Sequence, residues 1–143
     1  MTVVDKDPLG EAVTVEPVKK FRPVAINVGV NDLPRAIAFY EALFEAPLEV
    51  EQSGGRPTHA RAQFGDDDRT FFLLNLRERE ADAPHRDHVS AFGFNVEDLD
   101  GAHARAVAAG ATGLFGPVEQ PGLPRHAGFK DPSGNRVVLW QQS

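Results

Sequence analysis

Two of the five histidines in this chain, His59 and His126, are the side chains best suited to catalysis. An imidazole titrates near neutral pH, so a pair of them could serve as general acid and general base. The alternative is that each histidine is solvated or hydrogen-bonded and takes no part in chemistry. The sequence contains no cysteine, which excludes thiolate metal sites, thiol catalysis and a disulfide framework.

Ligand recognition is the second kind of chemistry that the residue types permit. Arg61 can hold a carboxylate or phosphate through two parallel hydrogen bonds, or it can pair with a nearby Asp. Asn27 and Asn75 can fix a ligand amide or carbonyl, or they can mark strand bulges. Phe71 and Trp140 offer aromatic surface that either stacks on a ligand or fills space. The ligand-binding candidates are Asn27, His59, Arg61, Phe71, Asn75, His126 and Trp140.

These candidates fall in or beside segments with the composition and alternation of β-strands. Strands are expected over residues 23–30, 48–52, 58–64, 70–76 and 136–140. Because successive side chains of a strand point to opposite faces, the candidates share the face opposite the apolar residues. The sequence Asp131-Pro-Ser-Gly-Asn135 is a dense turn signal and predicts a hairpin before the last strand.

The chain repeats itself around two helices. Asp32 and Asp98 can each cap a helix, and the residues around them match in type. A constant spacing then aligns the later strands, so that Arg61 corresponds to His126 and Leu73 to Val138. The repeat predicts two tandem βαβββ modules of an α+β fold, at about residues 22–77 and 88–142.

The segments outside this repeat are expected to be peripheral. Residues 1–21 form an N-terminal arm, in which Val13–Val15 could add an edge strand. The polar stretch from Arg77 to Pro84 is expected to be a solvated linker between the modules.

The repeated motifs resemble those of the vicinal oxygen chelate superfamily, which includes glyoxalase I, extradiol dioxygenases and bleomycin-resistance proteins. The residues that carry the resemblance are Val30-Asn-Asp-Leu33 with Ala38-Phe-Tyr40, Val96-Glu-Asp-Leu99 with Ala108-Ala-Gly110-Ala, and Phe129-Lys-Asp-Pro-Ser-Gly-Asn135. It implies a single domain over residues 22–143, with a cupped mixed sheet and helices on the outside. A ligand cavity inside the cup and a homodimer are further implications of the resemblance.

The metal enzymes that this chain resembles carry His, Glu or Gln at four positions in the cup. By the resemblance these positions fall on Ala25, Leu73, Ala91 and Val138, and none of these side chains can donate a lone pair to a metal. We therefore expect no metal, no cofactor and no catalytic residue.

The expected function is metal-independent binding of an apolar or aromatic small molecule, such as an antibiotic or a metabolite. The alternative is a divalent-metal-dependent lyase, isomerase or dioxygenase that recruits its metal in another register. A further alternative is an enzyme that uses His59 and His126 as acid and base without a metal.

Composition narrows the partners and the compartment. A net charge of −6 argues against nucleic acid or an anionic membrane as the main partner. No apolar run approaches the roughly 20 residues of a membrane helix. The first residues, Met1-Thr-Val-Val-Asp-Lys-Asp, lack the basic start and apolar core of a signal peptide, so a cytoplasmic location is expected.

Overall fold

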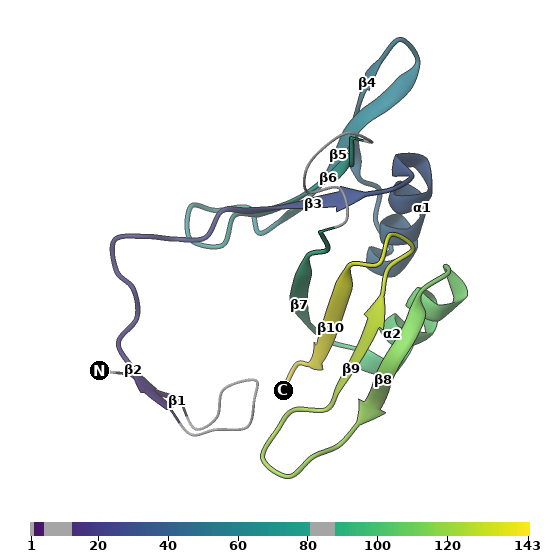
Figure 1. Ribbon diagram of the computed structural model, residues 1–143. Coiled ribbons are helices and arrows are strands. Elements are labelled where there is room, and N and C mark those ends of the chain that lie inside the picture. The colour runs from purple at the N-terminus through teal and green to yellow at the C-terminus, as the bar shows by residue number, and fades with distance from the viewer. Residues whose placement is uncertain (1, 5–12, 81–87) are drawn as a thin grey trace.

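Residues 25–78 and 91–141 repeat one order of elements, a strand, a helix and three further strands, in the computed structural model of the chain (Figure 1). The structure describes residues 2–4, 13–80 and 88–143. The repeated order confirms the predicted α+β class with two βαβββ modules.

The first module is built on a mixed sheet. Its elements are β3 (Ala25–Val30), α1 (Leu33–Phe44), β4 (Glu49–Ser53), β5 (Arg56–Phe64) and β6 (Phe72–Glu78). The strands lie in the order β3-β6-β5-β4, with β3 parallel to β6 and the other pairs antiparallel.

The second module repeats this sheet. Its elements are β7 (Ala91–Val96), α2 (Leu99–Ala108), β8 (Thr112–Val118), β9 (His126–Lys130) and β10 (Arg136–Gln141). The order is β7-β10-β9-β8, and β7 runs parallel to β10. The cupped sheet expected from the sequence is therefore divided into two separate mixed sheets of four strands each.

The N-terminal segment forms a small sheet of its own. β1 (Thr2–Val4) pairs with β2 (Val13–Val15) and with neither four-stranded sheet. In Figure 1 this two-stranded sheet lies away from both modules. Val13–Val15 is thus a strand, as predicted, although it is not an edge strand of the main sheets; residues 1 and 5–12 of the predicted arm lie outside the described residues.

Both helices begin where the capping signals predict. The side chain of Asp32 accepts a hydrogen bond from the Arg35 amide at 3.1 Å, and Asp98 accepts one from the Gly101 amide at the same distance. Each bond satisfies an amide that would otherwise lack a partner in the first turn of the helix. Within the described ranges, neither helix is long and apolar enough to cross a membrane.

One hydrophobic core joins the two modules. The helices lie on the same side of the two sheets and contact each other. Alternate residues of the strands pack against them, because strand side chains alternate between faces. The fully buried members include Val28, Tyr40, Leu76, Leu99, Phe129 and Leu139. In the described part of the chain no further layer covers the opposite face of either sheet, and six of the seven predicted ligand-binding residues lie in strands that form these faces.

The predicted Asp131–Asn135 hairpin ties the second module to the first through Asp131. This carboxylate is 4% exposed and accepts hydrogen bonds from the Tyr40 hydroxyl at 2.6 Å and from the amides of Ser133 and Asn135 at 2.9 Å. Burial raises the pKa of Tyr40 well above its ordinary value, and the charge of Asp131 and their hydrogen bond raise it further. The phenol therefore keeps its proton and donates a hydrogen bond to the carboxylate.

Asn135 makes a second set of bonds between the modules. It is fully buried; its Nδ2 donates to the Gly29 carbonyl at 2.9 Å, and its Oδ1 accepts from the Ser90 amide at 2.8 Å and from Arg79 at 3.0 Å. Arg79 also donates to Asn31 Oδ1 at 2.7 Å and to the Ser133 carbonyl at 3.1 Å.

The contacts of Arg79 correct the prediction of a solvated linker that starts at Arg77. The last strand of the first module continues to Glu78, and Arg79 bridges the two modules. Residues 81–84 of the predicted linker lie outside the described residues.

The strand register corrects the constant spacing assumed for the repeat. Phe64 pairs with Phe72 across the first hairpin, whereas Lys130 pairs with Arg136 across the second, so the first hairpin is longer. Ala25 lies beside Leu73 in the first sheet and Ala91 beside Arg136 in the second. The residue equivalent to Leu73 is therefore Arg136 and not Val138.

Candidate functional site

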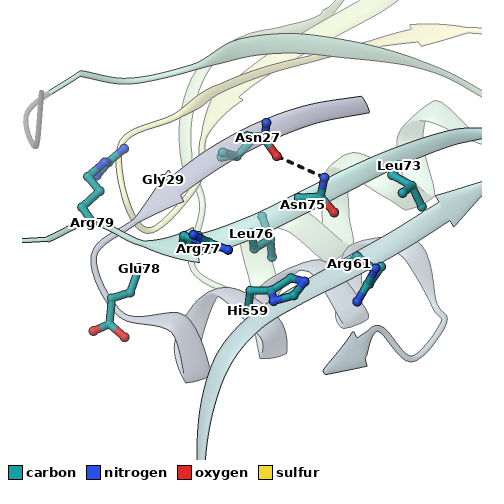
Figure 2. Close-up of a pocket in the computed structure, with 11 residues that line it drawn as sticks. Asn27, Gly29, His59, Arg61, Leu73, Asn75, Leu76, Arg77, Glu78 and Arg79 are labelled. Atoms are coloured by element: carbon teal, nitrogen blue, oxygen red, sulfur yellow. Dashed lines mark hydrogen bonds between the residues drawn. The ribbon is translucent and has the colours of Figure 1, made fainter. Parts of the chain in front are cut away.

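A hollow of about 610 Å³ lies on the uncovered face of the first sheet (Figure 2). Residues of β3, β5 and β6 line it, together with Arg79. Four of the predicted ligand-binding residues are among them: Asn27, His59, Arg61 and Asn75. The register explains their proximity, because Asn27 lies beside Asn75 on neighbouring strands and Asn75 lies beside Arg61.

The two asparagines form a polar pair in the hollow. Asn75 Nδ2 donates to Asn27 Oδ1 at 3.1 Å, as Figure 2 shows. This single bond leaves the Asn27 amide nitrogen and the Asn75 carbonyl oxygen available, so the pair can both donate to and accept from a ligand. Leu73 precedes Asn75 by two residues on the same face of β6 and adds apolar surface.

His59 and Arg61 are engaged by glutamates of β4. Glu51 pairs with Arg61 through a short hydrogen bond, and its other oxygen lies 3.2 Å from His59 Nδ1. Glu49 Oε1 lies 3.7 Å from the Arg61 guanidinium. The alternative that Arg61 pairs with a nearby Asp is corrected, because its partners are Glu49 and Glu51 of β4. The alternation of the two glutamates is visible in the sequence, but their places opposite Arg61 and His59 depend on the strand register.

One end of the hollow carries two further cations, Arg77 and Arg79. Arg77 lies beside His59 in the strand register, and Arg79 follows the end of β6. Sequence reasoning assigned both residues to the linker and missed them. If the alternation of strand side chains is continued beyond Asn75, Arg77 falls on the same face of the strand as Asn75.

The uncovered face of the second sheet carries three aromatic rings in a row. The ring of His126 stacks on Trp140 with centroids 4.6 Å apart and an angle of 27°, and Phe115 meets His126 edge-on at 5.6 Å. Small residues make room for these rings. A Cβ on Gly128 would overlap Phe115, and one on Gly93 would lie 3.4 Å from Trp140 Nε1.

Six of the seven predicted residues are thus divided between the two sheets. The hollow on the first sheet brings together Asn27, His59, Arg61 and Asn75, whereas His126 and Trp140 lie on the second sheet. Phe71 precedes β6 and belongs to neither group. The correspondence of Arg61 with His126 is wrong, because the strand register makes His59 the equivalent of His126. His59 pairs with Arg77 and His126 with Trp140, and each partner is the last outward-facing residue of its module's last strand.

The residue types at the metal positions do not fit a metal ion. By the resemblance the four positions are Ala25, Leu73, Ala91 and Val138, whose side chains offer no lone pair for coordination. Across residues 16–80 and 88–143, no three His, Asp or Glu side chains are grouped so that they could hold a metal. What the two faces can supply is hydrogen bonding, positive charge and aromatic stacking.

A second hollow of about 380 Å³ lies between the ends of the helices and β7. Phe44, Phe64 and Phe94 line it and contact one another, with ring centroids 5.3 to 5.5 Å apart. None of the predicted ligand-binding residues lies in it, so it is an alternative location for a bound molecule.

The family model described as the Glyoxalase/Bleomycin resistance protein/Dioxygenase superfamily matches residues 22–139. A glyoxalase-related enzyme from Fulvimarina pelagi is a similar solved structure, with a TM-score of 0.65 and 19% identity over 85% of this chain and 88% of that chain. TnmS3, an antibiotic binding protein from Streptomyces sp. CB03234, is 25% identical with a TM-score of 0.60, over 88% of this chain and 100% of that chain. No curated protein sequence matches the chain.

Proposed function

This chain belongs to the glyoxalase/bleomycin resistance protein/dioxygenase superfamily, and we propose that it binds an apolar or aromatic small molecule without a metal ion. The observation that carries the proposal is the hollow of about 610 Å³, in which polar side chains of three strands lie beside the apolar Leu73. Small-molecule sites usually have volumes of about 300–1,000 Å³ and contain polar groups that fix the orientation of the ligand. The similarity to TnmS3, described as an antibiotic binding protein, supports an antibiotic or a metabolite as the ligand.

The donor chemistry of the family positions supports binding without metal catalysis. By the resemblance, Ala25, Leu73, Ala91 and Val138 occupy the places where a metal enzyme of this fold needs nitrogen or oxygen ligands. A chain with these residues still forms the sheet with its uncovered face, so it can still bind a small molecule on that face. A cytoplasmic location, proposed from composition alone, suits such a binding protein.

We extend the proposal to a homodimer in which the two uncovered faces are combined. The hollow on the first sheet is lined by residues between 27 and 79 alone, and the aromatic row lies on the other sheet. Phe115 at the edge of that row is 42% exposed. If the first face of one copy covers the second face of another, an aromatic ligand would meet the polar groups and the rings together. Light scattering after size-exclusion chromatography tests the dimer.

Calorimetry with a panel of aromatic metabolites and antibiotics tests binding. We expect at least one compound to bind once per chain, and to shift the indole signal of Trp140, the single tryptophan, in the ¹H–¹⁵N spectrum. Trp140→Ala and Phe115→Ala should each weaken it about fivefold to tenfold, since ring contacts contribute about 0.5–1.5 kcal/mol beyond area burial. Leu114→Ala is the control, because Leu114 is similarly exposed next to Phe115.

Two results would contradict the proposed site. Binding that is unchanged in the combined Trp140→Ala and Phe71→Ala variant would show that the ligand does not use the predicted aromatic residues. Signal shifts confined to Phe44, Phe64 and Phe94 would locate the ligand in the second hollow instead.

The rival function is a metal-dependent lyase, isomerase or dioxygenase, or an acid–base enzyme that uses His59 and His126. One observation favours it, the pairing of His59 Nδ1 with Glu51 at 3.2 Å, which is how a carboxylate orients a general base. Elemental analysis of protein purified without a histidine tag separates the functions. A stoichiometric divalent ion, whose removal by chelator lowers the melting temperature, would favour the enzyme.

A further inference from the structure

We propose that the ligand is an organic acid whose carboxylate binds Arg77, an inference that rests on the proposed binding function and names its ligand class. Arg77 lines the hollow on the first sheet, on the same face as Asn75 and beside His59 in the strand register. Its side chain forms no hydrogen bond or ion pair with any residue in the described part of the chain. A guanidinium in this position offers a ligand up to five donors in a planar fork.

The other cations in the hollow are already engaged. Arg61 is neutralised by Glu51 and Glu49. The Nε atom of Arg61 has no hydrogen-bond partner among the described residues, and because this atom is buried a ligand cannot reach it. Arg79 donates to Asn31, the Ser133 carbonyl and Asn135, and its stem passes 2.9 Å from the place that a Cβ on Gly29 would occupy. Arg77 is therefore the arginine of this hollow that is free to bind an anion.

Arg79 strengthens the positive potential at Arg77 without competing for the ligand. Its three partners are a carbonyl and two amide oxygens, none of which carries a charge, and it forms no ion pair within 4 Å among the described residues. Glu78 is the acidic residue that lines the hollow, and it points away from Arg77 (Figure 2). Two arginines without carboxylate partners thus lie at one end of the hollow, in a chain whose net charge is −6.

This arrangement selects against a neutral ligand. A ligand that covers Arg77 removes water from the guanidinium, and a neutral group replaces only part of that hydration. A carboxylate restores it with two parallel charge-assisted hydrogen bonds, which are roughly twice as strong as neutral ones. An electrostatic attraction of this kind also speeds association.

The strand geometry sets the spacing of the ligand's polar groups. Arg77 and Asn75 are two residues apart on one face of β6, which separates their Cα atoms by about 6.6 Å. A carboxylate on Arg77 therefore leaves room for one aromatic ring before a second polar group meets Asn75 and Asn27. The ligand class that fits is an aromatic acid with a hydrogen-bonding group at the opposite end of the ring.

The test compares an aromatic acid with its neutral amide. Calorimetric titrations with 4-hydroxybenzoate and its neutral amide, 4-hydroxybenzamide, would be made on the wild-type chain, Arg77→Gln and the matched control Arg56→Gln, each checked for an unchanged melting temperature. Arg56 is exposed at the start of β5, the strand next to β6, and lines no part of the hollow. We expect the acid to bind the wild type at least about tenfold more tightly than the amide. Arg77→Gln should weaken only the acid, to the level of the amide, and Arg56→Gln should change neither.

The outcomes separate this inference from the proposed function. Equal affinities of acid and amide for the wild type, or an equal weakening of both by Arg77→Gln, would overturn the assignment of Arg77 while binding itself stands. If neither probe nor any compound of the aromatic panel binds, both the inference and the proposed function are wrong.

Discussion

Tyr40 donates a hydrogen bond of 2.6 Å to the buried carboxylate of Asp131, and Tyr40→Phe removes that bond while keeping the ring. The ring contacts with Phe39 and Phe44, at 5.0 and 5.6 Å, should persist, so no cavity is expected. A hydrogen bond to a charged group contributes about 1.5–3 kcal/mol. Because Asp131 keeps three other donors, we expect a loss of about 2 kcal/mol in the free energy of unfolding. The melting temperature should fall by about 6 °C.

The pH dependence gives the same prediction a second readout. The pKa of Tyr40 is higher in the folded chain than in the unfolded chain, where it is about 10. The contribution of the protonated phenol is therefore complete below about pH 10 and is lost as the pH rises through the folded pKa. Between pH 10 and the folded pKa, the wild type should lose about 1.4 kcal/mol per pH unit more than Tyr40→Phe.

Urea denaturation at pH 7 and above pH 10 measures both effects. Tyr40 is the single tyrosine in the sequence, so the absorbance of tyrosinate reports this residue alone. The native chain should show no tyrosinate at a pH where the unfolded chain is half ionised. The reasoning is refuted if Tyr40→Phe costs less than about 0.5 kcal/mol, or if Tyr40 titrates with a pKa near 10 in the native chain.

Three further substitutions test the junction and the two faces. Asn135→Ala removes the partner of Gly29, Ser90 and Arg79 and should cost about 3–5 kcal/mol in thermal or urea unfolding; a cost below 1 kcal/mol would contradict its role at the junction. Gly128→Ala should displace the exposed ring of Phe115 from His126, visible by NMR, with a loss of ligand affinity and little change in melting temperature. Glu51→Gln breaks exposed pairs and should change stability by less than about 1 kcal/mol, while a larger change would mean that the ion pair holds the sheet together.

Local signals in the sequence were sufficient for the elements of this fold. Asp32 and Asp98 cap the two helices as predicted, because a capping side chain needs only an amide three residues ahead. The outward faces of the strands were also predictable, since alternation depends on neighbouring residues alone. Asn27 and Asn75 therefore meet on one face, as expected.

The strand register of the second module could not be predicted from a constant spacing between the two modules. The first hairpin is longer than the second, so one spacing cannot align both strands that flank it. A hairpin can change length without any change in the faces of its strands. For this reason a constant spacing aligned Leu73 with Val138, whereas the strand register aligns it with Arg136.

The candidate site was only partly predictable, because its charges depend on pairing between strands. Glu51 reaches Arg61 and His59 through the β4–β5 register, which the sequence does not specify. Phe115 joins the aromatic row only because β8 lies beside β9, and its segment carried no motif. Arg79 was assigned to a linker, since its partners in the other module are distant in sequence.

The measurement that tests metal-independent binding most directly is a calorimetric titration of chelator-treated protein with the tightest compound of the aromatic panel. It would be followed by ¹H–¹⁵N spectra of the same sample. The account predicts one site per chain, unchanged affinity after chelation, and shifts at the side-chain amides of Asn27 and Asn75 and at the indole of Trp140. Binding that disappears on chelation and returns with an added divalent ion would contradict it.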